Sequence, residues 1–139
     1  MPDHRKLPAF QAVEALAQAL SDAFGPPTEP DGLPARLWRS AAAAAAAISR
    51  GSALPRARFA DALGEGVERL LDLGFNVDFG VRRGDFDLGT AVELLEYQTR
   101  ARLEMVLLRD RVARERAGHD ETTTSGMEYE RQLEAVELR

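Results

Sequence analysis

The chain has 139 residues and a formal net charge of −5, with 45% hydrophobic and 29% charged residues, which is typical of a single globular domain. It contains no cysteine, which excludes disulfide bonds, thiolate metal sites and cysteine nucleophiles. No apolar run approaches the roughly 18 residues of a membrane-spanning helix, and the N-terminal residues lack the apolar core of a signal peptide, so we expect a cytoplasmic protein.

The first predicted helix lies in the N-terminal quarter of the chain. Apolar residues recur there at helical spacing, and Gly25, followed by two prolines, should end the helix. The members of this apolar stripe are Leu7, Phe10, Val13, Leu16, Leu20 and Phe24. A second helix should begin near Pro34 and end at Gly51, where we expect glycine to serve as a left-handed C-cap. Its stripe consists of Leu33, Leu37, Ala41, Ala44 and Ile48.

Two more helices follow the second. Pro55 should open the third helix, whose apolar positions are Phe59, Leu63, Val67, Leu70, Leu73 and Val77. Gly80, Gly84, Asp85 and Asp87 predict a turn in which either aspartate caps the fourth helix. That helix should run to about Arg116 and pack through one stripe, formed by Leu88, Val92, Leu95, Thr99, Leu103 and Val106.

The elements together indicate one fold class. No alternating β pattern is present, and four amphipathic helices with short connections bury their stripes most simply as an antiparallel up-and-down four-helix bundle, which we assign to residues 1–117. Residues 118–139 contain six acidic residues against two arginines and include a Thr-Ser-Gly linker. We therefore expect this segment to be an acidic, flexible and mostly disordered tail.

Small residues are concentrated in the second and third helices. Seven consecutive alanines occupy positions 41–47, and Gly64 and Gly66 lie inside the third helix. Each glycine costs about 1 kcal/mol relative to alanine in a helix. One interpretation is that alanine simply propagates the helix and the glycines are tolerated. The other, which we favour, is that the small residues allow the backbones to approach closely.

Groups for catalysis or metal binding are scarce. The two histidines, His4 and His119, lie outside the predicted core stripes, and a di-iron bundle would need two inward-facing Glu-x-x-His units. We therefore predict that the chain is not an enzyme and has no catalytic residues, no cofactor and no metal site. A bundle metalloenzyme is a remote alternative, which a measurement of bound metal would decide.

Positive charge gathers around the second helix. Between Leu33 and Ala60 the chain has five arginines and no acidic residue. The candidate interaction residues are Arg36, Arg39, Arg50, Arg56 and Arg58, together with the neighbouring Trp38. One hypothesis is that the arginines contact phosphates. The alternative is a solvated face whose arginines pair with acids of neighbouring helices or subunits. Trp38 should lie at the edge of the core or in a subunit contact.

The segment from Leu37 to Gly51 resembles the signature of the four-helix bundle protein family. That family includes proteins encoded in intervening sequences of bacterial large-subunit rRNA genes and is similar to the accessory protein of diversity-generating retroelements. Its pattern is approximately Leu-x-Arg-Ala-x-x-Ser-Ile-x-x-Asn-Ile-Ala-Glu-Gly, and the positions in register here are Leu37, Arg39, Ile48 and Gly51. A downstream pattern is matched by Phe59, Leu63, Leu70, Asp72 and Leu73. The resemblance covers about residues 7–113, but Ala43, Ala47 and Arg50 replace the family's Ser, Asn and Glu.

The resemblance carries expectations about assembly and partners. It implies a ring-like homopentamer and, through the retroelement proteins, binding to nucleic acid and a reverse transcriptase. The net charge of −5 argues against a general polyanion binder. We therefore predict a non-enzymatic homo-oligomeric adaptor that binds another macromolecule. The alternative is a nucleic-acid-binding accessory protein of a reverse transcriptase that uses an arginine stripe on the second helix. Arg36, Arg39 and Arg50 form this stripe, and Arg56 and Arg58 follow the connecting loop.

Overall fold

The computed structural model describes residues 3–122, with side chains up to Glu115. A short 3-10 helix, η1 (His4–Lys6), precedes four α-helices. These are α1 (Pro8–Phe24), α2 (Leu33–Gly51), α3 (Arg56–Arg83) and α4 (Leu88–Thr122). The described part of the chain contains no strand.

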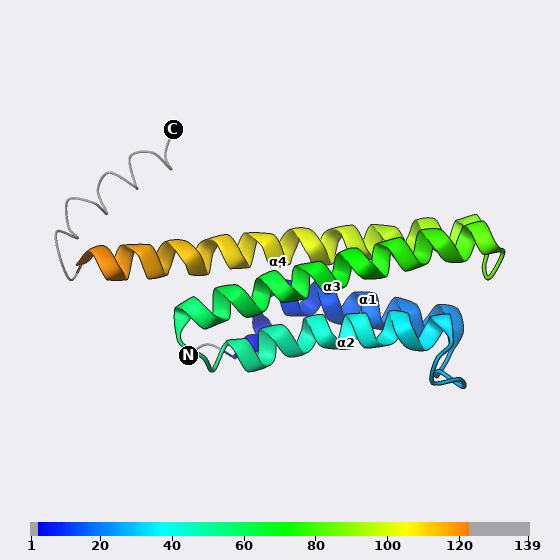
Figure 1. Ribbon diagram of the computed structural model, residues 1–139, viewed down its shortest axis with the longest axis horizontal. Coiled ribbons are helices and arrows are strands. Elements are labelled where there is room, and N and C mark those ends of the chain that lie inside the picture. Colours follow the sequence, from blue (N-terminus) through cyan, green and yellow to red (C-terminus); the bar gives the residue numbers. More distant parts are fainter. Residues whose placement is uncertain (1–2, 123–139) are drawn as a thin grey trace.

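The four helices form a closed arrangement in which each packs against its neighbours along the chain. α1 contacts α2, α2 contacts α3, and α3 contacts α4, while α1 also contacts α4 (Figure 1). Short connections reverse the chain direction between successive helices (Figure 1). The predicted antiparallel up-and-down four-helix bundle is therefore confirmed.

The core is built from the predicted stripes of the first three helices. From α1, Val13, Leu16 and Leu20 are buried, while Leu7, Phe10 and Phe24 pack partly buried against the core. The buried residues of α2 include Leu37, Ala41, Ala44 and Ile48, and those of α3 include Phe59, Leu63, Val67, Leu70, Leu73 and Val77. These are the residues that the helical periodicity predicts.

The prediction for α4 was wrong about which face is buried. The core-facing residues of α4 are Ala91, Leu94, Gln98, Ala101, Met105, Leu108 and Val112. In the predicted stripe, Leu88, Val92, Thr99 and Leu103 are exposed, and Leu95 and Val106 are only partly buried. The physical reason is that α4 is apolar on two faces, and a single bundle covers only one. The buried face combines two alanines, Ala91 and Ala101, with larger side chains such as Leu94 and Met105.

Small residues bring the helices close together, as the preferred interpretation predicted. A Cβ atom added to Gly66 would lie 3.2 Å from Cβ of Ala47 in α2 and would meet the Met105 side chain of α4. In contrast, Gly64 has nothing closer than Cδ of Arg109, at 3.9 Å. The packing at position 66 therefore leaves no room for a side chain, whereas position 64 has room for a Cβ atom.

Two glycines at helix ends differ from the prediction. Gly51 is the last residue of α2, but the described residues with positive φ are Gly25 and Gly84, so Gly51 is not a left-handed cap. Its role is a close contact instead, because an added Cβ would lie 2.7 Å from Cδ1 of Phe59. Gly84, with φ of 78°, is the left-handed C-cap of α3.

Asp87 caps the start of α4. Its Oδ1 accepts a hydrogen bond of 2.7 Å from the backbone N–H of Thr90, in agreement with the prediction that an aspartate caps this helix. The hydrogen bonds from the Thr90 backbone and then its side chain lower the pKa of Asp87. The ionised carboxylate therefore stabilises the folded state at pH values above the ordinary pKa of aspartate. This stabilisation is lost as the pH falls through the lowered pKa that Asp87 has in the folded state.

α4 is longer than predicted. It continues to Thr122 rather than ending near Arg116, because a single glycine at position 118 weakens a helix without ending it. The proposed boundary between residues 117 and 118 consequently falls within α4, and most of the predicted tail lies outside the described residues. Among the described residues, none of the helices combines the length and apolarity needed to span a membrane.

Candidate interaction surfaces

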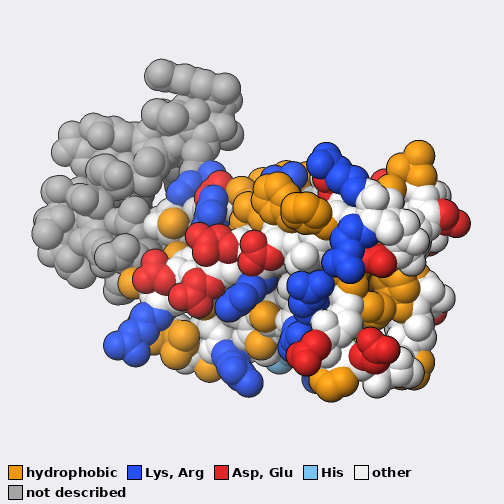
Figure 2. Space-filling view, turned by 45° about the vertical axis from the view of Figure 1, so that its right-hand side comes forward, with side chains coloured by type: hydrophobic (Ala, Val, Ile, Leu, Met, Phe, Trp, Pro, Cys, Tyr) orange, Lys and Arg blue, Asp and Glu red, His pale blue; other side chains and the backbone are white. Residues whose placement is uncertain are grey.

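An apolar surface runs along the outside of α3 and α4, and we call it the outer face. Its members have 40% to 68% of their surface exposed. They are Leu71, Phe75 and Phe79 of α3 with Leu88, Val92, Leu103 and Leu107 of α4. Hydrophobic side chains gather along the upper edge of the molecule in Figure 2, where α3 and α4 lie.

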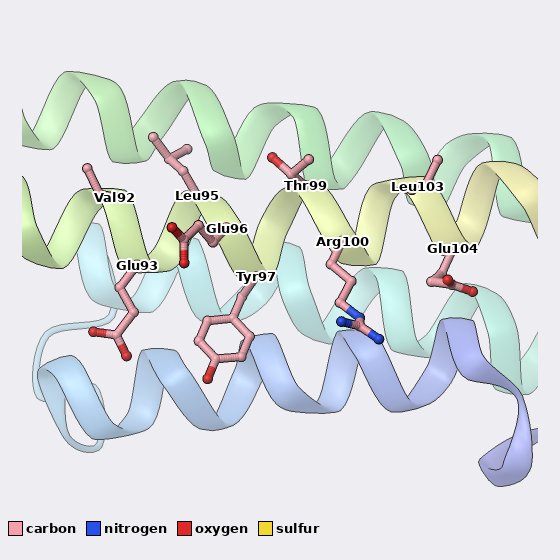
Figure 3. A pocket seen from close by; sticks show the side chains of 9 residues that line it. All are labelled: Val92, Glu93, Leu95, Glu96, Tyr97, Thr99, Arg100, Leu103 and Glu104. Carbon is pink, nitrogen blue, oxygen red and sulfur yellow. The ribbon is translucent and has the colours of Figure 1, made fainter.

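α4 divides this surface into two sides. Val92, Leu95, Thr99 and Leu103 point toward α3, as Figure 3 shows. On the other side of the helix, charged and polar side chains point toward α1, namely Glu93, Tyr97, Arg100 and Glu104 (Figure 3). An open groove of about 990 Å³ follows this surface of α4. The groove therefore has an apolar wall beside α3 and a charged wall beside α1.

The size of the outer face exceeds what single exposed residues explain. With about 100 Å² exposed on each of seven large side chains, the face presents roughly 700 Å² of apolar surface. The largest apolar patch on a typical monomeric protein is about 300–600 Å², and larger ones mark contact sites. Seven large exposed side chains on two adjacent helices therefore make the outer face a candidate contact surface.

A second surface lies between α2 and α3 and contains two of the predicted arginines. Arg36 and Arg39 line an open cleft of about 540 Å³ together with Arg69 of α3. The α3 wall, which holds Arg69, also carries Phe75 and Phe79 of the outer face, which are 65% and 57% exposed. We call this the arginine cleft. Cations next to exposed aromatic rings suit a ligand that has both negative charge and flat rings.

Arg39 is partly held in place within the cleft. Its Nη1 donates a hydrogen bond of 2.6 Å to the backbone carbonyl of Pro30, in the loop before α2. Asp72 also lines the cleft and reduces its positive charge. The cleft is therefore a moderately cationic surface rather than a strongly basic one.

The other predicted residues are not part of this cleft. Arg56 forms a 3.5 Å ion pair with Glu115 of α4, which agrees with the alternative that the arginines pair with acids of a neighbouring helix. Arg50 and Arg58 are exposed near the end of α2 and the start of α3. Trp38 is 41% exposed on α2. Of the five arginines, Arg36 and Arg39 therefore line the cleft, whereas Arg56 pairs with Glu115.

Sequence reasoning missed three residues of the arginine cleft, namely Arg69, Phe75 and Phe79. Phe75 and Phe79 are four residues apart, so they share one side of α3, and both fall outside the stripe assigned to the core. Two phenylalanines that repeat on the polar side of an amphipathic helix are a signal of an exposed contact. The four-residue spacing of Phe75 and Phe79 is therefore the sequence signal for this exposed surface.

The acidic and histidine side chains of the described region form no metal-binding cluster. No group of three or more His, Cys, Asp or Glu side chains lies close enough to hold a metal ion there. The two surfaces instead offer apolar contacts and arginines. The class that the fold and the surfaces define is an all-α four-helix bundle with exposed contact faces.

Comparison of the chain with protein-family models, with curated proteins and with solved structures gave no match. The resemblance of residues 37–51 to the four-helix bundle protein family therefore stays a prediction.

Proposed function

We propose that this chain is a non-enzymatic helical-bundle adaptor that associates with copies of itself and binds another macromolecule. The observation that carries the proposal is the outer face, whose large apolar side chains are exposed on two helices that pack against each other. Exposing these side chains to water is unfavourable by about 25 cal/mol per Å², and association with another surface removes that cost. Family resemblance supports self-association as well, since it implies a ring of five subunits.

Two features of the composition support the non-enzymatic and cytoplasmic parts of the proposal. The chain has two histidines and no cysteine, so nucleophile–base pairs are poorly supplied. A chain without cysteine also suits a reducing compartment such as the cytoplasm.

We expect the wild-type protein to be oligomeric at micromolar concentration in multi-angle light scattering. Leu103→Glu should raise the dissociation constant by about 100-fold or more, because an unpaired carboxylate in a buried contact costs several kcal/mol. The helix content in circular dichroism should not change, since Leu103 is 55% exposed in the single chain.

Leu54→Glu is the matched control for this measurement. Leu54 is 39% exposed in the connection between α2 and α3, away from the outer face, so this variant should associate like the wild type. A wild-type protein that stays monomeric up to 100-fold higher concentration, on the order of 100 μM, would contradict the proposal.

A second candidate function is the binding of single-stranded nucleic acid in the arginine cleft. The observation that favours it is the position of Arg36, Arg39 and Arg69 around the exposed rings of Phe75 and Phe79. Arginines attract the phosphates, and bases stack on aromatic rings with about 1–3 kcal/mol per base.

The test of this second candidate is fluorescence anisotropy with a labelled single-stranded oligonucleotide. The affinity should fall steeply with salt, and Phe75→Ala should weaken binding by about 10-fold, as expected for the loss of one stacked base. Arg36→Glu should weaken binding and also reduce the salt dependence. Arg58→Glu, outside the cleft, is the charge-matched control. Equal effects of Arg36→Glu and Arg58→Glu would show that the cleft is not the binding site.

A further inference from the structure

We propose that the outer face is a symmetric dimer interface between two copies of this chain, with a twofold axis passing beside Thr99, so that the two α4 helices run antiparallel across it. This inference rests on the proposed self-association and specifies its partner, orientation and register. Such an interface uses the same surface of both copies. If residue i of the first copy meets residue j of the second, then residue j of the first copy also meets residue i of the second.

The first observation is the spacing of the apolar residues on α4. Val92, Leu95, Thr99 and Leu103 lie on one side of the helix (Figure 3), and helical spacing puts Val106 on the same side. Their successive separations are three, four, four and three residues, and Leu95 and Val106 are partly buried against the core. This order is the same when it is read from either end, with Thr99 in the middle. When two copies run antiparallel about Thr99, Val92 therefore faces Val106 of the other copy, and Leu95 faces Leu103.

The spacing also keeps the row straight. The average separation of these residues is about 3.5 residues, close to the 3.6 of one helical turn, so the row runs nearly parallel to the helix axis. A straight row meets a second straight row along its whole length at a small crossing angle. Thr99 at the centre is small enough for the two helices to approach closely there.

The second observation comes from α3 and is independent of the α4 spacing. The contacts of Gly66 with Met105 and of Gly74 with Gln98 define how α3 and α4 lie alongside each other. By interpolation, Leu71 is level with Ala101, and Phe75 is level with Tyr97. Ala101 and Tyr97 lie two residues from Thr99, on opposite sides of it along α4. Leu71 and Phe75 are therefore equally far from the level of Thr99.

The same axis therefore relates the exposed side chains of α3. It brings Leu71 of one copy to the level of Phe75 of the other, and Phe75, which also lines the arginine cleft, lies at the α2 side of this contact. Leu71 and Phe75 are 40% and 65% exposed in the single chain. One symmetry operation thus accounts for the exposed apolar residues near the centre of the face on α3 and on α4.

The exposed area favours a second copy as the occupant. A stable interface buries about 800 Å² on each partner, and the outer face offers roughly 700 Å² of apolar surface, of which Leu88 and Leu107 lie beyond the symmetric row. An unrelated partner would have no reason to require a row that is symmetric about one residue. A second copy does require it, because its own row runs in the reverse direction.

Disulfide trapping tests the register, and the absence of cysteine from the natural chain makes each introduced thiol unique. Helices packed 8–10 Å apart place facing Cα atoms at about 4–6 Å, within disulfide reach. Thr99→Cys should therefore give a covalent dimer under mild oxidation. Leu95→Cys mixed with Leu103→Cys should give mainly the mixed dimer, because the two copies of either single variant are separated by about 12 Å along the axis.

Glu93→Cys is the control, since Glu93 is exposed on the same helix but points toward α1 (Figure 3). It should give at least about 10-fold less covalent dimer than Thr99→Cys does under the same conditions. In addition, Thr99→Arg should raise the dimer dissociation constant by about 100-fold or more, because it places two like charges together at the axis.

The outcomes separate this inference from the proposed function. A wild-type assembly of five subunits, or efficient trapping through Glu93→Cys instead of Thr99→Cys, would overturn the twofold axis at Thr99 and leave self-association intact. A monomeric wild-type protein would overturn both. A dimer that is trapped through Thr99→Cys and through the Leu95–Leu103 pair would establish the interface.

Discussion

Replacing Leu94 by alanine should lower the free energy of unfolding by about 2–5 kcal/mol, a large part of the roughly 5–15 kcal/mol that stabilises a domain of this size. Leu94 is 1% exposed and lies on the core-facing side of α4. The truncation removes buried apolar contacts and leaves a cavity that the surrounding helices fill only in part. Thermal unfolding should show a decrease in Tm of about 10 °C or more.

Leu103→Ala is the matched control, because it removes the same atoms from the opposite face of α4. Leu103 is 55% exposed, so its contribution to the folding of a single chain should be below about 1 kcal/mol. Any larger effect of Leu103→Ala should disappear on dilution, since it comes from contacts between copies, whereas the effect of Leu94→Ala should not. The reverse result, with Leu103 more important at low concentration, would mean that the other face of α4 is the core.

The second large effect is expected at the closest approach of the helices. Gly66→Val should destabilise the protein by about 1–3 kcal/mol, because the added side chain overlaps with Met105 and lies against Ala47. α3 would have to move away from α2 or α4, or Met105 would have to adopt an unfavourable rotamer. Chemical denaturation monitored by circular dichroism measures the change in the free energy of unfolding.

Gly64→Ala controls for the removal of a glycine from a helix. Gly64 has room for a Cβ atom, so this substitution should stabilise the protein by about 0.5–1 kcal/mol. If Met105 causes the overlap at Gly66, then Met105→Ala should be less harmful in the Gly66→Val background than in the wild type. If Met105→Ala lowered the free energy of unfolding by the same amount in both backgrounds, the close contact between Gly66 and Met105 would be contradicted.

The sequence predicted three of the four buried stripes but not the fourth. In α1, α2 and α3 the longest apolar stripe is the buried one, so helical periodicity identifies the buried residues directly, even though α3 also exposes Leu71, Phe75 and Phe79. α4 has an apolar row on both sides, and the exposed row has the larger residues. Hydrophobicity alone therefore favoured Val92 and Leu103 over Ala91 and Ala101. The short separation of α3 from α4, which decides the question, depends on contacts such as Gly66 with Met105 that periodicity does not contain.

The candidate surfaces were predictable only in part. Arg36 and Arg39 were identified because they occur on a helix without acids, and both line the arginine cleft. Arg69 was missed because it lies on another helix, about 30 residues further along the chain. It comes close to Arg36 and Arg39 only when α2 packs on α3. Arg56 was included because it is close in sequence, but its side chain reaches Glu115.

The length of α4 divides this helix into parts with different stability. With 35 residues it extends about 52 Å, roughly twice the length of the 17-residue α1, and its C-terminal end passes beyond the other helices in Figure 1. After Val112, the described side chains of Ala113, Arg114 and Glu115 are exposed. Opening the backbone hydrogen bonds of residues 113–115 breaks the exposed Arg56–Glu115 ion pair but uncovers no buried side chain among these three residues, so this segment can open separately from unfolding of the bundle.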